Sequence, residues 1–168
     1  MQRSDFEIMA PVGCYESLHA AIDAGADAVY FGVGRLNMRS KSSVNFTIDD
    51  LHNIADICER AGVKSYLTVN TIAYDDDLPA IYEVIDAVAG SHISAIIASD
   101  IATILYAREK GVEVHISTQC NISNTEALRF YSRWADVAVL ARELNMDQVA
   151  AIHRAIEEQN ICGPAGKP

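Results

Sequence analysis

Polar side chains that could bind a substrate follow several apolar segments of the sequence. Asn70 comes directly after "YLTV", Gln119 follows "VHIST", and Arg142 and Glu143 follow "VAVLA". The two amides could orient a ligand by hydrogen bonds or satisfy neighbouring loops, and the residues alone leave both interpretations open. A guanidinium at position 142 could hold a carboxylate or phosphate through paired hydrogen bonds. The alternative is an ion pair between Arg142 and Glu143.

A long connection, "GVGRLNMRSKSSVNF" at 32–46, offers a second group of candidate residues. It has 15 residues, whereas connections of about two to six residues are usual, and surplus length of this kind is typical of a lid or binding loop. Arg35 and Arg39 on it could grip an anion or could be solvated surface residues. "GVGR" lacks the third glycine of a dinucleotide-binding fingerprint.

The common nucleophile and metal patterns are absent from the sequence. His115 and Cys120 would lie about 16 Å apart on an extended strand, so a buried, hydrogen-bonded His115 is the better prediction. The four cysteines are far apart and are expected to be reduced, with Cys58 on the apolar stripe of a helix. Neither HExxH nor GxSxG occurs. We therefore assign no catalytic residue and expect no metal site in this chain.

The elements that position these residues follow a repeated pattern of amphipathic helix, glycine and short apolar strand. Helix starts are predicted where a capping residue precedes a polar partner by three positions, at Thr47, Ser123 and Asn145. Strands alternating with helices imply parallel pairing through right-handed crossovers. The six predicted strands lie within "FEIMAP" at 6–11, "AGADAVYFG" at 24–32, "AGVKSYLTVN" at 61–70, "SHISAIIAS" at 91–99, "KGVEVHIST" at 110–118 and "WADVAVLAR" at 134–142.

Two architectures fit this pattern, an open doubly wound sheet and a closed barrel. Central strands of an open sheet are covered on both faces and should be almost continuously apolar. Here polar residues alternate with apolar ones in "KSYLTVN" and "VEVHISTQ". The alternation favours an α/β fold of the parallel (β/α) TIM-like barrel type, with polar groups lining its interior and mouth. A complete barrel of this type has eight strand-helix units. The pattern shows six units in 168 residues, an average of 28 residues each. The barrel is therefore expected to be incomplete.

Composition indicates an ordinary globular protein. Hydrophobic residues make up 50% of the chain, charged residues 21%, and the net charge is −10. The negative charge argues against a broad basic surface for nucleic acid. No apolar run is long enough for a membrane helix, and the start lacks the apolar run of a signal peptide, so a cytoplasmic protein without membrane contact is expected. We expect one domain over residues 1–168, the amino-terminal portion of a barrel.

Five ordered motifs resemble a known family. "MAPVGCYESLHAAIDAGADAVYFG", "LNMRS" followed by "NFT", "YLTVNT", "HISTQCNISN" and "VLARELNMDQV" are similar to the amino-terminal half of the U-thirty-two peptidase (collagenase-like protease) family. The resemblance covers residues 7–156. It implies substrate-binding roles for Asn37, Arg39, Asn70, Gln119, Arg142 and Glu143, and it carries no catalytic role onto Cys14 or Cys120.

The resemblance also implies three alternatives for function. The parent protein is expected to be an RNA-modifying hydroxylase, acting on tRNA uridine or ribosomal RNA cytidine. It would use an iron–sulfur cluster whose cysteines follow Pro168, with no cofactor in this chain. The second alternative is a collagenase-like peptidase acting on a peptide substrate. The third is a non-catalytic fragment that forms a homo-oligomer through exposed barrel edges, inactive by itself.

Overall fold

The computed structural model describes residues 3, 6–34, 36 and 46–168, and contains one sheet of six parallel strands joined in chain order. Each strand lies within one of the six predicted segments, so the predicted strands and their parallel pairing are confirmed. The strands are β1 (Met9–Pro11), β2 (Ala28–Gly32), β3 (Lys64–Val69), β4 (Ala95–Ala98), β5 (Val114–Ile116) and β6 (Val137–Ala138).

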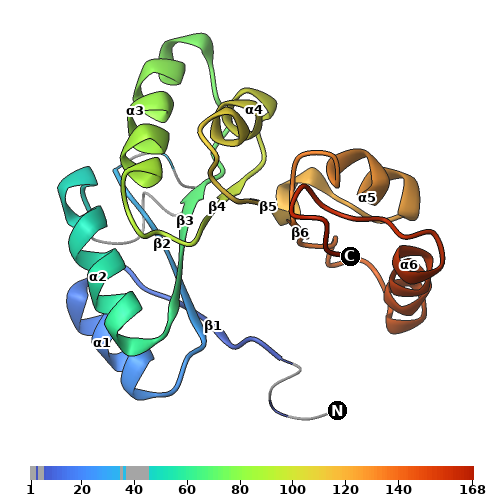
Figure 1. The fold of residues 1–168 in the computed structure, drawn as a ribbon, viewed down its shortest axis with the longest axis horizontal. Helices are drawn as coiled ribbons and strands as arrows, with labels where there is room; N and C mark the ends of the chain where they lie inside the picture. Colours follow the sequence, from blue (N-terminus) through green and yellow to red (C-terminus); the bar gives the residue numbers. More distant parts are fainter. Residues whose placement is uncertain (1–2, 4–5, 35, 37–45) are drawn as a thin grey trace.

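Helices connect successive strands and surround the curved row of strands (Figure 1). In a doubly wound sheet the strand order reverses at one point, whereas here it runs from β1 to β6 without reversal. The strands therefore form a half-barrel, which confirms the incomplete barrel and rules out the doubly wound sheet. The helices are α1 (Tyr15–Asp23), α2 (Leu51–Ala61), α3 (Leu78–Ala89), α4 (Ile101–Glu109), α5 (Thr125–Tyr131) and α6 (Met146–Glu158), with short 3-10 turns η2 (Ile48–Asp50), η3 (Asp75–Asp77) and η4 (Thr118–Cys120).

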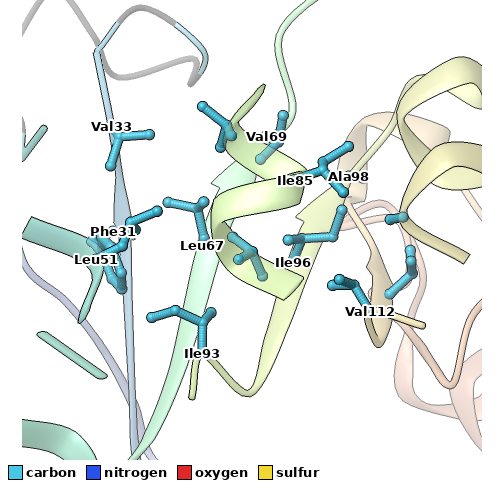
Figure 2. Close-up of a cluster of buried hydrophobic side chains, with 14 of the residues drawn as sticks. Phe31, Val33, Leu51, Leu67, Val69, Ile85, Ile93, Ile96, Ala98 and Val112 are labelled. Atoms are coloured by element: carbon cyan, nitrogen blue, oxygen red, sulfur yellow. The ribbon is translucent and has the colours of Figure 1, made fainter. Parts of the chain in front are cut away.

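The main hydrophobic core lies between the sheet and the helices. Phe31, Leu67 and Ile96 extend from three neighbouring strands toward Leu51 of α2 and Ile85 of α3, as Figure 2 shows. These five side chains are at most 2% exposed. Alternate residues of a strand point to opposite faces, so the helix-facing positions are the apolar half of the pattern.

A second and smaller cluster lies on the opposite, concave face of the sheet. It contains Ala28, Tyr66, Ala95 and Ile97, with Tyr30 packed against it. The polar strand residues predicted to line the barrel interior belong to this face, where Thr68 donates a hydrogen bond of 2.8 Å to the main-chain oxygen of Phe31.

Side-chain caps fix the helix starts. The predicted box at Thr47 is present, because Asp50 Oδ2 accepts from the Thr47 N–H at 2.8 Å. The box at Asn145 is also present at the start of α6. The prediction for α5 is wrong by one residue, since Asn124 and not Ser123 is the cap and accepts from the N–H of Ala127 at 2.9 Å.

None of the helices that the structure describes combines the length and apolar character needed to cross a membrane.

Candidate functional site

Four polar residues meet at the carboxyl ends of β3, β4 and β5. Asn70 follows β3, and its Nδ2 donates to Ser117 Oγ at 3.3 Å. Ser99 follows β4, and its hydroxyl donates to the main-chain oxygen of Asn70 at 3.3 Å. Ser117 follows β5, and its hydroxyl donates to Oε1 of Gln119 at 3.4 Å. The structure therefore brings together two of the predicted residues, Asn70 and Gln119, through a serine that lies between them.

The sheet register and a tight turn hold this group in place. The N–H of Ser117 donates to the oxygen of Ala98 at 2.8 Å, which continues the β4–β5 ladder by one residue. The chain then turns through η4, where the N–H of Cys120 donates to the oxygen of Ser117 at 3.1 Å. Asn121 ends the turn with a φ of 48°, a left-handed conformation that asparagine tolerates. Gln119 is thereby left exposed above a buried Ser117.

Arg142 and Glu143 lie on the connection that follows β6. This connection is tied to the same edge of the sheet, the carboxyl ends of the strands, which we call the rim. Ile122 and Leu140 form an isolated parallel bridge, and the N–H of Ala141 donates to the oxygen of Ile122 at 2.9 Å. Both charged residues are exposed. Neither has an ion-pair or hydrogen-bond partner among the residues that the structure describes, so the alternative of an Arg142–Glu143 ion pair is wrong. Arg142 is available to a ligand.

The other two predicted residues, Asn37 and Arg39, and also Arg35, lie outside the described residues. The two ends of their connection are fixed beside each other, because Val33 and Phe46 form a parallel bridge. The N–H of Gly34 donates to the oxygen of Phe46 at 3.1 Å. The connection therefore leaves and returns at the carboxyl end of β2, which is the predicted rim.

A buried aromatic pair lies deeper on the concave face. The rings of Tyr66 and His115 are 4.7 Å apart and the two residues are 3% and 6% exposed. His115 Nε2 lies 2.9 Å from Glu113 Oε1, and the Tyr66 hydroxyl donates to Glu7 Oε1 at 2.7 Å. The prediction of a buried, hydrogen-bonded His115 is confirmed. Burial, with the bond to the Glu7 carboxylate, raises the pKa of Tyr66 well above its usual range.

Two of the thiols, Cys58 and Cys120, are held in the protonated form by burial. Burial raises the pKa of Cys58 to about 11, and this residue packs in the core as predicted. Burial also raises the pKa of Cys120, whose Sγ donates to the oxygen of Ser99 at 3.5 Å, although the Tyr131 hydroxyl opposes part of the shift. A reactive cysteine requires the opposite, a lowered pKa. The Asp100 side chain caps α4 by accepting hydrogen bonds from the N–H groups of Ala102 and Thr103, so this strand-end carboxylate has a structural role.

The described residues do not fit an iron–sulfur cluster. Within residues 3, 6–34, 36 and 46–168, no three His, Cys, Asp or Glu side chains are arranged to hold a metal. Cys58 lies inside α2, Cys14 precedes α1, Cys120 follows β5 and Cys162 follows α6. Cluster ligation needs several thiolates together. No step proposed below passes through a cluster.

Ser99 and Ser117 were not among the predicted site residues. Ser117 shares the polar face of its segment with His115 and Gln119, two residues away on either side. That alternation placed it on the concave face, but its role depends on the β3–β5 arrangement, which a single sequence does not show. Ser99 gave the weaker signal of a polar residue directly after an apolar strand.

Comparisons with known proteins find relatives that match most or all of the chain. The profile of Peptidase family U32 matches residues 13–161. The chain is 67% identical to a protein named collagenase from Porphyromonas gingivalis, covering 100% of this chain and 41% of that protein. It is 36% identical to the 23S rRNA 5-hydroxycytidine C2501 synthase of Escherichia coli, covering 90% of this chain and 23% of that enzyme. Further relatives are named for tRNA hydroxylation.

A solved structure supports the fold. The U32 peptidase Mk0906 superposes with a TM-score of 0.71 at 18% identity, over 88% of this chain and 64% of that one.

The chain spans less than half the length of the curated relatives described above. With a profile match over most of its residues and close identity to a named relative, the chain belongs to Peptidase family U32.

Proposed function

We propose that this chain supplies the base-binding rim of an enzyme that hydroxylates a pyrimidine in tRNA or ribosomal RNA. The observation that carries the proposal is the rim itself. It combines side-chain amides, hydroxyls and a guanidinium without a partner among the described residues, while burial raises the pKa of the nearby Cys120 thiol. Relatives named for rRNA and tRNA hydroxylation support the same reaction. This role would place the protein in the cytoplasm.

The rim groups suit an unpaired pyrimidine. Cytosine and uracil present carbonyl oxygens and nitrogen donors or acceptors along one edge, and amide side chains match such edges. Gln119 and Asn70 provide amides within one hydrogen-bonded group. Arg142, exposed on the neighbouring connection, would contact a phosphate of the same nucleotide or an anionic co-substrate.

The charge of the chain sets a limit on how RNA is held. With a net charge of −10, this chain offers no general attraction to phosphates. Recognition would therefore depend on local contacts at the rim and on the remainder of the parent protein. The resemblance implies an iron–sulfur cluster for the oxidation, and we propose that residues outside this chain hold it.

Nucleoside analysis of cells tests the proposal. A strain lacking the full-length gene is compared with strains complemented by the wild-type gene or by Gln119→Ala. We expect 5-hydroxypyrimidine in total tRNA or rRNA to disappear on deletion, to return with the wild type and to stay low with the variant. Unchanged hydroxypyrimidine content in the deletion strain would contradict the proposal.

A peptidase is the second candidate, and the 67% identity to a protein named collagenase favours it. The full-length protein is incubated with gelatin, with and without a chelator. Cleavage that is lost in Gln119→Ala and Arg142→Ala would establish this alternative. No cleavage under either condition would count against it.

Self-association is the third alternative, and the outer strands favour it. β1 and β6 each pair with one neighbour only in the described sheet. Met9 and Val137, on these edges, are both 42% exposed. Unpaired strand edges can pair with another chain. Light scattering of this 168-residue chain would show a dimer or larger species if the edges associate, and a concentration-independent monomer if they do not.

A further inference from the structure

The hydroxyl of Ser117 is hydrogen-bonded in three directions. It accepts from Asn70 Nδ2 at 3.3 Å and from the N–H of Gln119 at 3.5 Å, and it donates to Oε1 of Gln119 at 3.4 Å. A serine hydroxyl has one proton to donate and two lone pairs to accept with, so these bonds use its full capacity. The residue is 3% exposed, so water does not compete for it.

This arrangement sets the direction of the Gln119 amide. Oε1 and Nε2 diverge from Cδ within the amide plane, so with Oε1 directed at the buried hydroxyl the Nε2 group is directed away from it, and Gln119 is exposed. An NH₂ group at this position has two protons to donate. At Gln119 the rim therefore presents a hydrogen-bond donor rather than an acceptor.

We propose that Ser117 is a positioning residue that orients the Gln119 and Asn70 amides, so that Gln119 donates a hydrogen bond to a carbonyl oxygen of the bound base. Ser117 does not react with the substrate. Its proton is directed at an amide oxygen, and His115, two residues away on the same face, is engaged with Glu113 rather than with this hydroxyl. The nature of the ligand rests on the proposed function, whereas the orientation of the amides does not.

Ser99 provides a matched control. It also lies directly after a strand of the same rim, although it is only partly buried, and its hydroxyl donates to the main-chain oxygen of Asn70 and not to a side-chain amide. Removing the Ser99 hydroxyl therefore costs one rim hydrogen bond while both amides keep their partner. A difference between Ser117→Ala and Ser99→Ala isolates the positioning effect.

The first measurement needs no substrate. In this chain labelled with ¹⁵N, the side-chain NH₂ signals of Asn70 and Gln119 are assigned by their loss in Asn70→Asp and Gln119→Glu. We expect the heteronuclear NOE of the Gln119 amide to be that of an ordered group in the wild type and in Ser99→Ala, and to fall to that of a free amide in Ser117→Ala. We expect the NOE of the Asn70 amide to decrease in Ser117→Ala. Unchanged values in a folded Ser117→Ala variant would overturn the proposal.

The second measurement uses the full-length protein and an unmodified tRNA or rRNA transcript. Losing an oriented hydrogen bond should weaken binding by about five- to ten-fold in Ser117→Ala, and the loss in Ser99→Ala should be smaller. If Ser117 acts through Gln119, Ser117→Ala adds little once Gln119→Ala is present. Fully additive losses would overturn the proposal. If wild-type protein binds neither transcript, the proposed function fails, while the NMR result still decides the role of Ser117.

Discussion

Phe46 offers a sharp test of how the half-barrel supports its rim, because it fixes the returning end of the 32–46 connection. Its ring is 4% exposed and meets the ring of Tyr15 edge-on at 5.3 Å and that of Phe31 at 5.6 Å. The connection that it anchors carries the predicted residues Asn37 and Arg39. Two substitutions separate the size of this side chain from its aromatic contacts.

The expected losses of unfolding free energy follow from these contacts. Phe46→Leu keeps an apolar side chain in the core but removes two edge-to-face contacts, each worth about 0.5–1.5 kcal/mol, so a loss of about 1–3 kcal/mol is expected. Phe46→Ala also leaves a cavity and should cost about 3–5 kcal/mol. Both losses are large beside the total stability of a typical domain, about 5–15 kcal/mol.

Urea unfolding measures both losses. The chain has one tryptophan, Trp134, which packs against Phe130 far along the chain from Phe46. Its fluorescence and the far-UV circular dichroism should report the same transition, with an unchanged slope and a lower midpoint. Equal stability losses for the two variants, or a loss below about 1 kcal/mol for Phe46→Ala, would refute the anchoring role assigned to this ring.

The remaining predictions concern a helix cap, a carboxylate and a thiol. Asn124→Ala should cost about 1 kcal/mol in thermal or urea unfolding and Ser123→Ala almost nothing, because only Asn124 caps α5; the reverse order would refute the assignment. Burial alone would raise the pKa of Glu7, but hydrogen bonds from Lys64 and Tyr66 outweigh it and lower the pKa. The stabilisation is therefore present above the unfolded pKa of about 4.3 and is lost as the pH falls through the lower folded value. The stability gap between wild type and Glu7→Gln should shrink on acidification, and a gap independent of pH would contradict this. Cys58, with its pKa raised to about 11, should resist a thiol reagent at pH 8 until the chain is unfolded; rapid modification of Cys58 in the native protein would show that it is not buried.

The strands and their order were predictable from sequence because each signal was local. Alternation of apolar and polar residues in "KSYLTVN" placed Leu67 and Val69 toward the helices, and these residues are fully buried there. Boundaries were less certain. The segment 134–142 forms a strand of only two residues, Val137–Ala138, and farther along it Leu140 forms an isolated bridge with Ile122, which lies beyond β5.

The parts that sequence did not predict depend on contacts between distant segments. Asn70 and Gln119 were predicted separately, but the hydroxyl that joins them belongs to Ser117, 47 residues from Asn70. The α5 cap was misplaced because Ser123 and Asn124 are both good capping residues, and the sequence alone does not distinguish them.

The contrast between the two faces of the sheet has a consequence for how this protein can change during evolution. Most of the large buried side chains lie on the helix side, while the concave side has a small cluster and then polar residues toward the rim. If the proposed rim binds the ligand, substitutions at residues such as Gln119 and Arg142 should alter which ligand is bound at little expense in folding stability. Relatives that share this half-barrel can diverge in substrate while the helix-facing half of every strand stays under selection for packing.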